Sequence, residues 1–205
     1  MAKEAQTAEE AQTAEAAPMM GMPSMLAYTL RAPIQPNAGL ALIRVGQGPS
    51  GQSLTPNQPK DRSYWIVILD ANKPATIVQQ WVVQDNTTVP SNLDQYMTNP
   101  GYLFAVVTQV LPNSMVPQGA FYDYLAAHGA GRELQKLEQI SSYTDPPYGV
   151  FGLVSYILTG QCGPTINVSY EVGSFYEPAV LEMSLMPMQN GQPPYSICDT
   201  YTFVH

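Results

Sequence analysis

Three strongly apolar segments of strand length constrain the fold of this chain more than any other feature. Residues 64–69, 102–110 and 150–158 are rich in aromatic and β-branched side chains. Runs of this length are typical of strands that are buried on both faces. None of them approaches the ~20 apolar residues of a membrane helix, so we expect no membrane insertion. The sequence therefore predicts a globular fold built around central β-strands.

Further strands are predicted on both sides of these runs. The turn from Asp70 to Lys73 predicts that residues 76–83 return against the first apolar run as a hairpin. Additional strands are predicted at residues 26–30, 40–45, 166–172, 180–186 and 197–204, and residues 46–62 are predicted to be a long loop.

Helical spacing is confined to the middle of the chain. A short helix is predicted within residues 87–97, and two more are predicted to meet near Gly129, a natural helix C-cap, within residues 119–140. The order of strands, then helices, then strands predicts an α+β fold. We expect a largely antiparallel or mixed β-sheet with about three short helices.

The N-terminal residues differ in composition from the rest. Residues 4–15 contain a short duplication of Glu, Ala, Gln and Thr without an apolar stripe, which predicts a disordered tail. Four of the ten methionines then fall within residues 19–25. They form either a lead-in that packs on the core or an adaptable contact segment. We expect residues 1–25 to be a disordered acidic, Met-rich tail and residues 26–205 to be one domain.

Charge is scarce and mostly acidic. Charged residues make up 12% of the chain, against an ordinary ~25%, and the formal net charge is -8. The eight Lys and Arg residues are scattered. Because phosphate binding needs clustered cations, we expect no nucleic-acid partner. The N-terminus has no secretion signal, which predicts a cytoplasmic protein by default, with export by a signal-less route left open.

Residues for catalysis or metal binding are sparse. His128 and His205 are the only histidines, and their spacing from Cys162 and Cys198 predicts no metal site. No phosphate-binding loop, dinucleotide motif or nucleophile elbow is present, so we expect no cofactor and no enzyme. Glu171, Glu177 and Glu182 leave open a hydrolase with dispersed carboxylates. The two cysteines are either separate thiols or a disulfide between Cys162 and Cys198.

Aromatic side chains near the C-terminus are the best candidates for recognition. Tyrosine rings beside amides suit sugar binding, and tyrosine is also enriched at protein interfaces. Residues 187–196 are predicted to be a polar recognition loop shaped by Gly and Pro. The candidate binding residues are Tyr170, Phe175, Tyr176, Asn190, Gln192 and Tyr195.

The order of elements across residues 63–163 has a counterpart in a known family. It consists of the apolar run at 64–70, the hairpin return to Val83, a short helix to Tyr96, strand 102–108, the helical stretch 121–137 and segment 154–163. This order resembles the interleukin-like epithelial–mesenchymal transition inducer domain, which also forms the stem of an enzyme that extends protein O-mannose glycans. The resemblance implies a non-enzymatic binding module, with glycans among its ligands. It carries over no functional residue.

These observations favour a non-catalytic binding or structural-assembly protein with an aromatic, weakly charged surface. Its partner is expected to be another protein or a second copy, since a weakly charged sheet edge has little to repel pairing. The two alternatives are a carbohydrate-binding module and a hydrolase with dispersed carboxylates.

Overall fold

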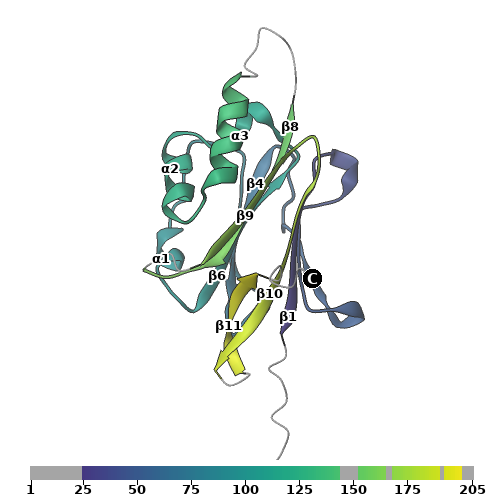
Figure 1. The fold of residues 1–205 in the computed structure, drawn as a ribbon, viewed down its shortest axis with the longest axis vertical. Coiled ribbons are helices and arrows are strands. Elements are labelled where there is room, and N and C mark those ends of the chain that lie inside the picture. The colour runs from purple at the N-terminus through teal and green to yellow at the C-terminus, as the bar shows by residue number, and fades with distance from the viewer. Residues whose placement is uncertain (1–24, 144–151, 165–167, 190–191, 200–205) are drawn as a thin grey trace, which may run out of the picture.

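The fold has three layers, two antiparallel β-sheets and a layer of helices (Figure 1). The computed structural model describes residues 25–143, 152–164, 168–189 and 192–199. This β-rich architecture confirms the predicted α+β class. The predicted tail, residues 1–25, lies outside the described residues except for Met25.

The first sheet, called the outer sheet below, has the strand order β11-β10-β1-β2-β3. Its strands are β1 (Leu26–Ala32), β2 (Leu42–Val45), β3 (Gln52–Leu54), β10 (Ala179–Gln189) and β11 (Gln192–Asp199). β1 lies at its centre, paired with β10 on one side and β2 on the other. The sheet therefore joins the two ends of the described chain.

The second sheet, called the central sheet, lies between the outer sheet and the helices. Its strands are β4 (Ser63–Asp70), β5 (Lys73–Val83), β6 (Tyr102–Gln109), β7 (Leu111–Pro112), β8 (Leu153–Gln161) and β9 (Ser169–Phe175). β5 pairs with β4, and β4 pairs with β6. β8 pairs with β6 and β7 along one side and with β9 along the other. The three apolar segments therefore become the buried strands β4, β6 and β8.

Alternation along β4 explains why its sequence is continuously apolar. Trp65 and Val67 pack into the core between the two sheets, whereas Tyr64 and Ile66 pack into a second core beneath the helices. Successive side chains of a strand point to opposite faces, so a strand between two cores needs apolar residues at every position.

The helices cover the face of the central sheet that is turned away from the outer sheet (Figure 1). They are α1 (Asp94–Met97), α2 (Gly119–Ala127) and α3 (Arg132–Tyr143). Gly129, with a φ of +96°, separates α2 from α3, which confirms the predicted helix pair. Three short 3-10 helices occupy connections: η1 (Pro36–Ala38), η2 (Gly48–Ser50) and η3 (Asn113–Met115).

Three predicted segments differ from the structure. The helix expected within residues 87–97 is reduced to α1, because the Asp85 carboxylate accepts hydrogen bonds from the Thr87 N–H (2.8 Å) and hydroxyl (2.7 Å) and holds a turn there. The loop expected at 46–62 contains η2 and β3. The loop expected at 187–196 is mostly the β10–β11 hairpin, in which Pro187 pairs with Tyr195 and Gln189 with Gln192.

Candidate functional site

The six residues predicted to form a binding surface lie in different environments. Tyr170 and Tyr195 pack against the core between the sheets, whereas Phe175 packs against the core beneath the helices. Tyr176, in the connection from β9 to β10, is 61% exposed. Gln192 is exposed at the start of β11, and Asn190 lies outside the described residues.

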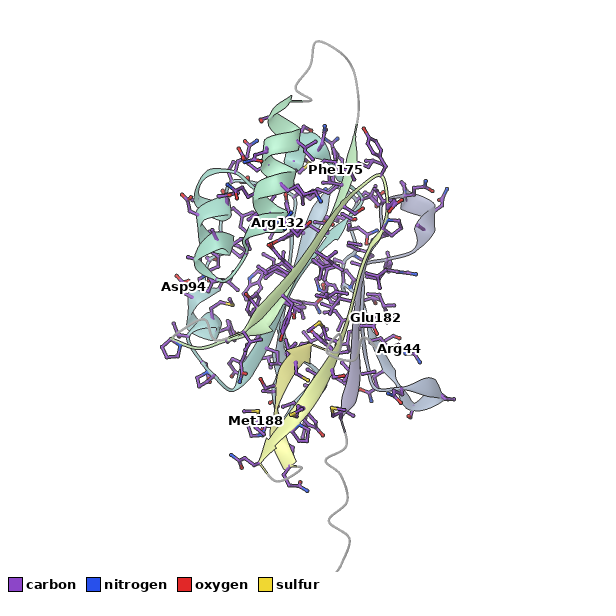
Figure 2. All side chains as sticks on the ribbon, viewed as in Figure 1. Arg44, Asp94, Arg132, Phe175, Glu182 and Met188 are labelled. Carbon is purple, nitrogen blue, oxygen red and sulfur yellow. The ribbon has the colours of Figure 1, made fainter. Side chains whose placement is uncertain are left out.

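The structure does not bring these residues together as one surface. β10 has eleven residues, so its two ends are about 35 Å apart at ~3.3 Å per residue. Phe175 and Tyr176 precede β10, whereas Gln192 and Tyr195 follow it. Figure 2 shows Phe175 towards one end of the molecule and Met188, near the β10–β11 turn, towards the other. The six residues therefore belong to at least two separate regions.

One of the six, Tyr195, lines a hollow of about 500 Å³ at the end of the two-sheet sandwich. The other lining residues come from the start of β1, from the β2–β3 connection and the strand residues that flank it, and from the β4–β5 turn and the first residues of β5: Leu26, Val45, Gly46, Gln47, Ser50, Gln52, Asn72, Lys73, Pro74, Ala75 and Thr76. The Tyr195 N–H donates a hydrogen bond to the carbonyl of Ala71 (2.7 Å), which fixes β11 against this turn. Small-molecule sites commonly occupy volumes of ~300–1,000 Å³.

The chemistry of this hollow is polar. Its described lining includes the amide residues Gln47, Gln52 and Asn72, the hydroxyl residue Thr76 and one charged residue, Lys73, and contains no carboxylate. Among the described residues, no hydrogen bond engages the side chains of Gln47, Gln52 or Thr76. These groups are therefore available to a ligand. Sequence inspection missed them because they come from two turns about 25 residues apart, with the Asp70–Lys73 turn as the only signal.

The carboxylate of Glu171 on β9 is committed to structure. It accepts hydrogen bonds from the backbone N–H groups of Glu133 (2.8 Å) and Leu134 (3.3 Å) in the first turn of α3. It also accepts one from the buried Tyr156 hydroxyl (2.9 Å). Glu171 on β9 thus caps the first turn of α3, a role usually taken by a residue next to the helix in sequence.

The other candidate catalytic groups are dispersed. The Nδ1 atom of His128 lies 2.8 Å from the Tyr124 carbonyl at the end of α2, and its ring packs 4.2 Å from the Tyr124 ring. Two further hollows are lined in part by Arg62 and by Tyr122, and Glu138 is the one carboxylate among their described lining residues. In the described part of the chain, no group of three or more His, Cys, Asp and Glu residues could hold a metal ion.

The two cysteines occupy separate parts of the structure and are not joined by a disulfide. The Cys162 sulfur is buried beneath the helices, 3.9 Å from the Met97 sulfur. Cys198 lies in β11, where its thiol donates to the Ser184 carbonyl (3.3 Å). Of the two alternatives for this pair, the structure has the separate thiols. Burial raises the pKa of the Cys162 thiol to about 12.

Four of the five edge strands of the described chain, among them the two-residue β7, are poorly suited to pairing with another chain. β3 has three residues. β11 contains Pro193 and Pro194, which lack an N–H, and its Tyr195 N–H is already bonded to Ala71. β9 carries the Glu171 carboxylate and packs against α3. Short strands, prolines and charges are the devices by which natural sheets avoid edge-to-edge association.

The fifth edge strand, β5, differs from these in its last residues, Gln79–Val83, which lie beyond Pro74 and the bulge. It has eleven residues and carries no charged side chain from Pro74 to Val83. Val78 forms a bulge and is 39% exposed, and the stretch from Gln79 to Val83 then pairs regularly with β4. No described strand pairs with its outer side.

The outer sheet also presents a face that no helix of the described residues packs against, called its uncovered face below. Tyr28, Leu30 and Met183 point into the core, so the alternating positions on β1 and β10 point away from it. Exposed apolar residues among these positions are Met25, Val180, Met186 and Met188. No helix of the described chain packs on this sheet.

Comparison with protein-family models found no matching family, and comparison with curated proteins found no matching relative. No helix in the described ranges is both long enough and apolar enough to cross a membrane.

Proposed function

We propose that this chain is a non-catalytic assembly protein that associates with copies of itself through the open edge of β5. The observation that carries the proposal is the contrast between β5 and the other described edge strands. A long, uncharged edge strand exposes backbone N–H and C=O groups to pairing, and no side chain there repels a second strand.

Antiparallel pairing of two β5 strands would extend the central sheet across both copies. A two-fold axis near Trp81 places Gln79–Val83 of each copy beside the same stretch of the other, which is the self-complementary arrangement of an isologous dimer. The uncharged side chains of this stretch meet without repulsion. The net charge of -8 is spread over the rest of the chain and is screened within ~8 Å at physiological salt.

The test measures the molecular mass of the protein at several concentrations, by light scattering coupled to size exclusion. We expect Val78→Lys to weaken association at least tenfold, because a lysine at an exposed edge position disfavours pairing. Gln135→Lys, which adds the same charge on the exposed side of α3, should leave association unchanged. Equal association of wild type, Val78→Lys and Gln135→Lys would rule out the β5 edge.

The hollow beside Tyr195 supports a second candidate function, binding of a neutral saccharide. Amides and hydroxyls of the described lining can bond sugar hydroxyls. Tyr195 is held by the core and by its bond to Ala71, so presenting its ring costs little conformational entropy. The resemblance of residues 63–163 points to the same class of non-enzymatic binding module.

A panel of neutral mono- and oligosaccharides, monitored by chemical-shift changes of backbone amides, tests this second function. We expect shifts confined to the residues around Gln47, Gln52 and Asn72, and a severalfold loss of affinity in Gln52→Ala. Gln135→Ala, on α3, is the control. If no saccharide shifts these amides at millimolar concentration, the hollow is not a sugar site.

A further inference from the structure

We infer that the uncovered face of the outer sheet is a second self-association surface, which packs face to face on the same surface of another copy. This face is separate from the β5 edge, and neither contact requires the other. The two-fold axis of the proposed pairing runs roughly along β1, the middle strand of the sheet. Two sheets stacked in this way keep their strands within about 30° of each other.

The pattern of charge on this face is self-complementary. In the register of the sheet, Thr29 of β1 lies between Glu182 of β10 and Arg44 of β2. Glu182 and Arg44 are therefore about 10 Å apart on either side of β1, two strand spacings of ~4.8 Å. Figure 2 shows the two side chains near each other beside β1. A two-fold axis along β1 places Glu182 of each copy over Arg44 of the other, giving two identical ion pairs.

The apolar positions follow the same symmetry. Val180 and Leu42 lie on either side of Arg31, so the axis that pairs Glu182 with Arg44 also stacks Val180 of one copy on Leu42 of the other. Val180 is 48% exposed and Met186 is 42% exposed. Methionine adapts its shape to irregular surfaces, and Met186 and Met188 can fill the contact towards the β10–β11 turn.

Arg31 lies on β1 and therefore on the proposed axis, where it would face Arg31 of the other copy and bring like charges together. Its guanidinium does not stand out from the sheet, because Nη2 donates to the Leu40 carbonyl (3.4 Å) and packs against Gly39. The side chain thus bends towards the η1 connection, and Nε is buried. The centre of the face is left to Thr29 and Ala27, whose small side chains allow close approach.

The size of the face suits a weak, concentration-dependent dimer. The 33 residues of its five strands, each occupying ~3.3 Å by ~4.8 Å, outline about 500 Å². Weak specific complexes commonly bury less than ~600 Å² on each partner. Because the β5 edge and this face are two different two-fold contacts, using both joins copies into an open chain rather than a closed dimer.

Charge reversal tests the face in the Val78→Lys background, where edge pairing is blocked. We expect Val78→Lys to retain a concentration-dependent dimer by sedimentation. Adding Glu182→Arg should weaken this dimer at least tenfold, since arginines then face each other. Adding Arg44→Glu as well should restore it to within about threefold, and this rescue also controls for the Arg44 bond to the Gly48 carbonyl (2.6 Å). Gln135→Lys is again the control for added charge.

Each outcome separates this inference from the proposed function. Wild-type association with a strictly monomeric Val78→Lys variant supports the edge and overturns the face. A Val78→Lys dimer that is insensitive to Glu182→Arg also overturns the face. Hydrogen exchange supplies an independent readout, because the β10 amides already pair with β1 and β11 and any further slowing must come from association. Exchange that is the same in dilute and in concentrated Val78→Lys samples overturns the contact between copies. Exchange that slows with concentration supports the contact between copies.

Discussion

The Glu171 carboxylate accepts hydrogen bonds from the buried Tyr156 hydroxyl and from the start of α3. The Tyr156 side chain is buried, and burial together with the nearby Glu171 carboxylate raises the pKa of its hydroxyl well above 10. The same carboxylate receives two backbone N–H groups of α3. One side chain on β9 therefore satisfies a buried hydroxyl on β8 and the start of a helix, which joins two layers of the fold.

Removal of this carboxylate is expected to be costly. Glu171→Ala should destabilise the protein by about 2–4 kcal/mol, combining a lost helix cap of ~1 kcal/mol with an unsatisfied buried hydroxyl of ~1–3 kcal/mol. Urea unfolding followed by circular dichroism measures the change. Glu177→Ala removes an exposed carboxylate a few residues away and should change stability by less than about 0.5 kcal/mol. Similar losses in both variants would contradict the capping role.

Cys162 is expected to be inert in the folded protein. With a pKa of about 12, the thiolate that reacts with iodoacetamide is a very small fraction at neutral pH, and the sulfur is also inaccessible. Alkylation of Cys162 at about pH 8 should be at least ~100-fold slower in native than in urea-unfolded protein. Peptide mass spectrometry measures the rate, and labelling at the unfolded rate would contradict the structure.

Individual contacts were the least predictable part of this protein. Tyr195 could be selected from sequence because aromatic residues near amides suggest recognition, and it does line a hollow. Tyr170 and Phe175 were selected by the same criterion but pack against the two cores. A tyrosine in a strand looks the same in sequence whether it points to solvent or to a neighbouring sheet, since that depends on long-range pairing.

At the scale of elements, β8 shows how closely neighbouring strands of the central sheet approach each other. Gly160 lies where a Cβ would meet the Phe104 ring at 2.7 Å and the Val168 carbonyl at 2.8 Å. Any side chain larger than hydrogen at this position collides with β6 on one side and with the chain leading into β9 on the other. The glycine is therefore required by packing between neighbouring strands rather than by its backbone angles.

Gly160→Ala is expected to destabilise the protein by about 1–3 kcal/mol, although alanine usually favours regular structure over glycine. Thermal unfolding followed by calorimetry gives the comparison. Gly131→Ala is the matched control, because its Cβ would make only an ordinary contact of 3.4 Å with the Glu171 carboxylate. A loss for Gly160→Ala no greater than for Gly131→Ala would contradict the close approach.

Elements with a strong periodic pattern were predicted well from sequence. The buried strands β4 and β6 followed from their apolar runs, and the break between α2 and α3 followed from Gly129. β3 was missed because its three residues, Gln52–Leu54, carry no pattern of their own and form a strand by pairing with β2. The division of the strands into two stacked sheets was not predicted, since side-chain alternation does not say which strands share a sheet.

At the scale of the whole molecule, buried tyrosines connect stability to pH. The pKa values of the Tyr28, Tyr64 and Tyr156 hydroxyls are all raised by burial. Their hydroxyls bond to Thr159, to the Met115 carbonyl and to Glu171, respectively. The folded state holds these protons more tightly than the unfolded state. Their contribution to stability is therefore complete below the ordinary tyrosine pKa of about 10 and declines as the pH rises above it.

The contribution of these tyrosines to the free energy of unfolding should consequently stay constant up to about pH 9.5. Above pH 10, the free energy of unfolding should fall by about 1.4 kcal/mol per pH unit for each buried tyrosine. Urea midpoints across this range measure the loss. Tyrosinate absorbance should show a late phase that coincides with unfolding, from the buried rings. Titration of all thirteen tyrosines in a single phase before unfolding would contradict the burial.

The strand β5 takes part in both of the functions proposed above. Its first residues, Lys73–Thr76, line the hollow, and its last residues form the open edge. In an antiparallel pair centred on Trp81, each hollow would lie about 20 Å from the axis, so the two would be about 40 Å apart at opposite ends of the joined strands. A polymeric ligand that repeats at this spacing would engage both copies at once, and avidity would then raise its apparent affinity by ~10²–10⁴ without any new contact.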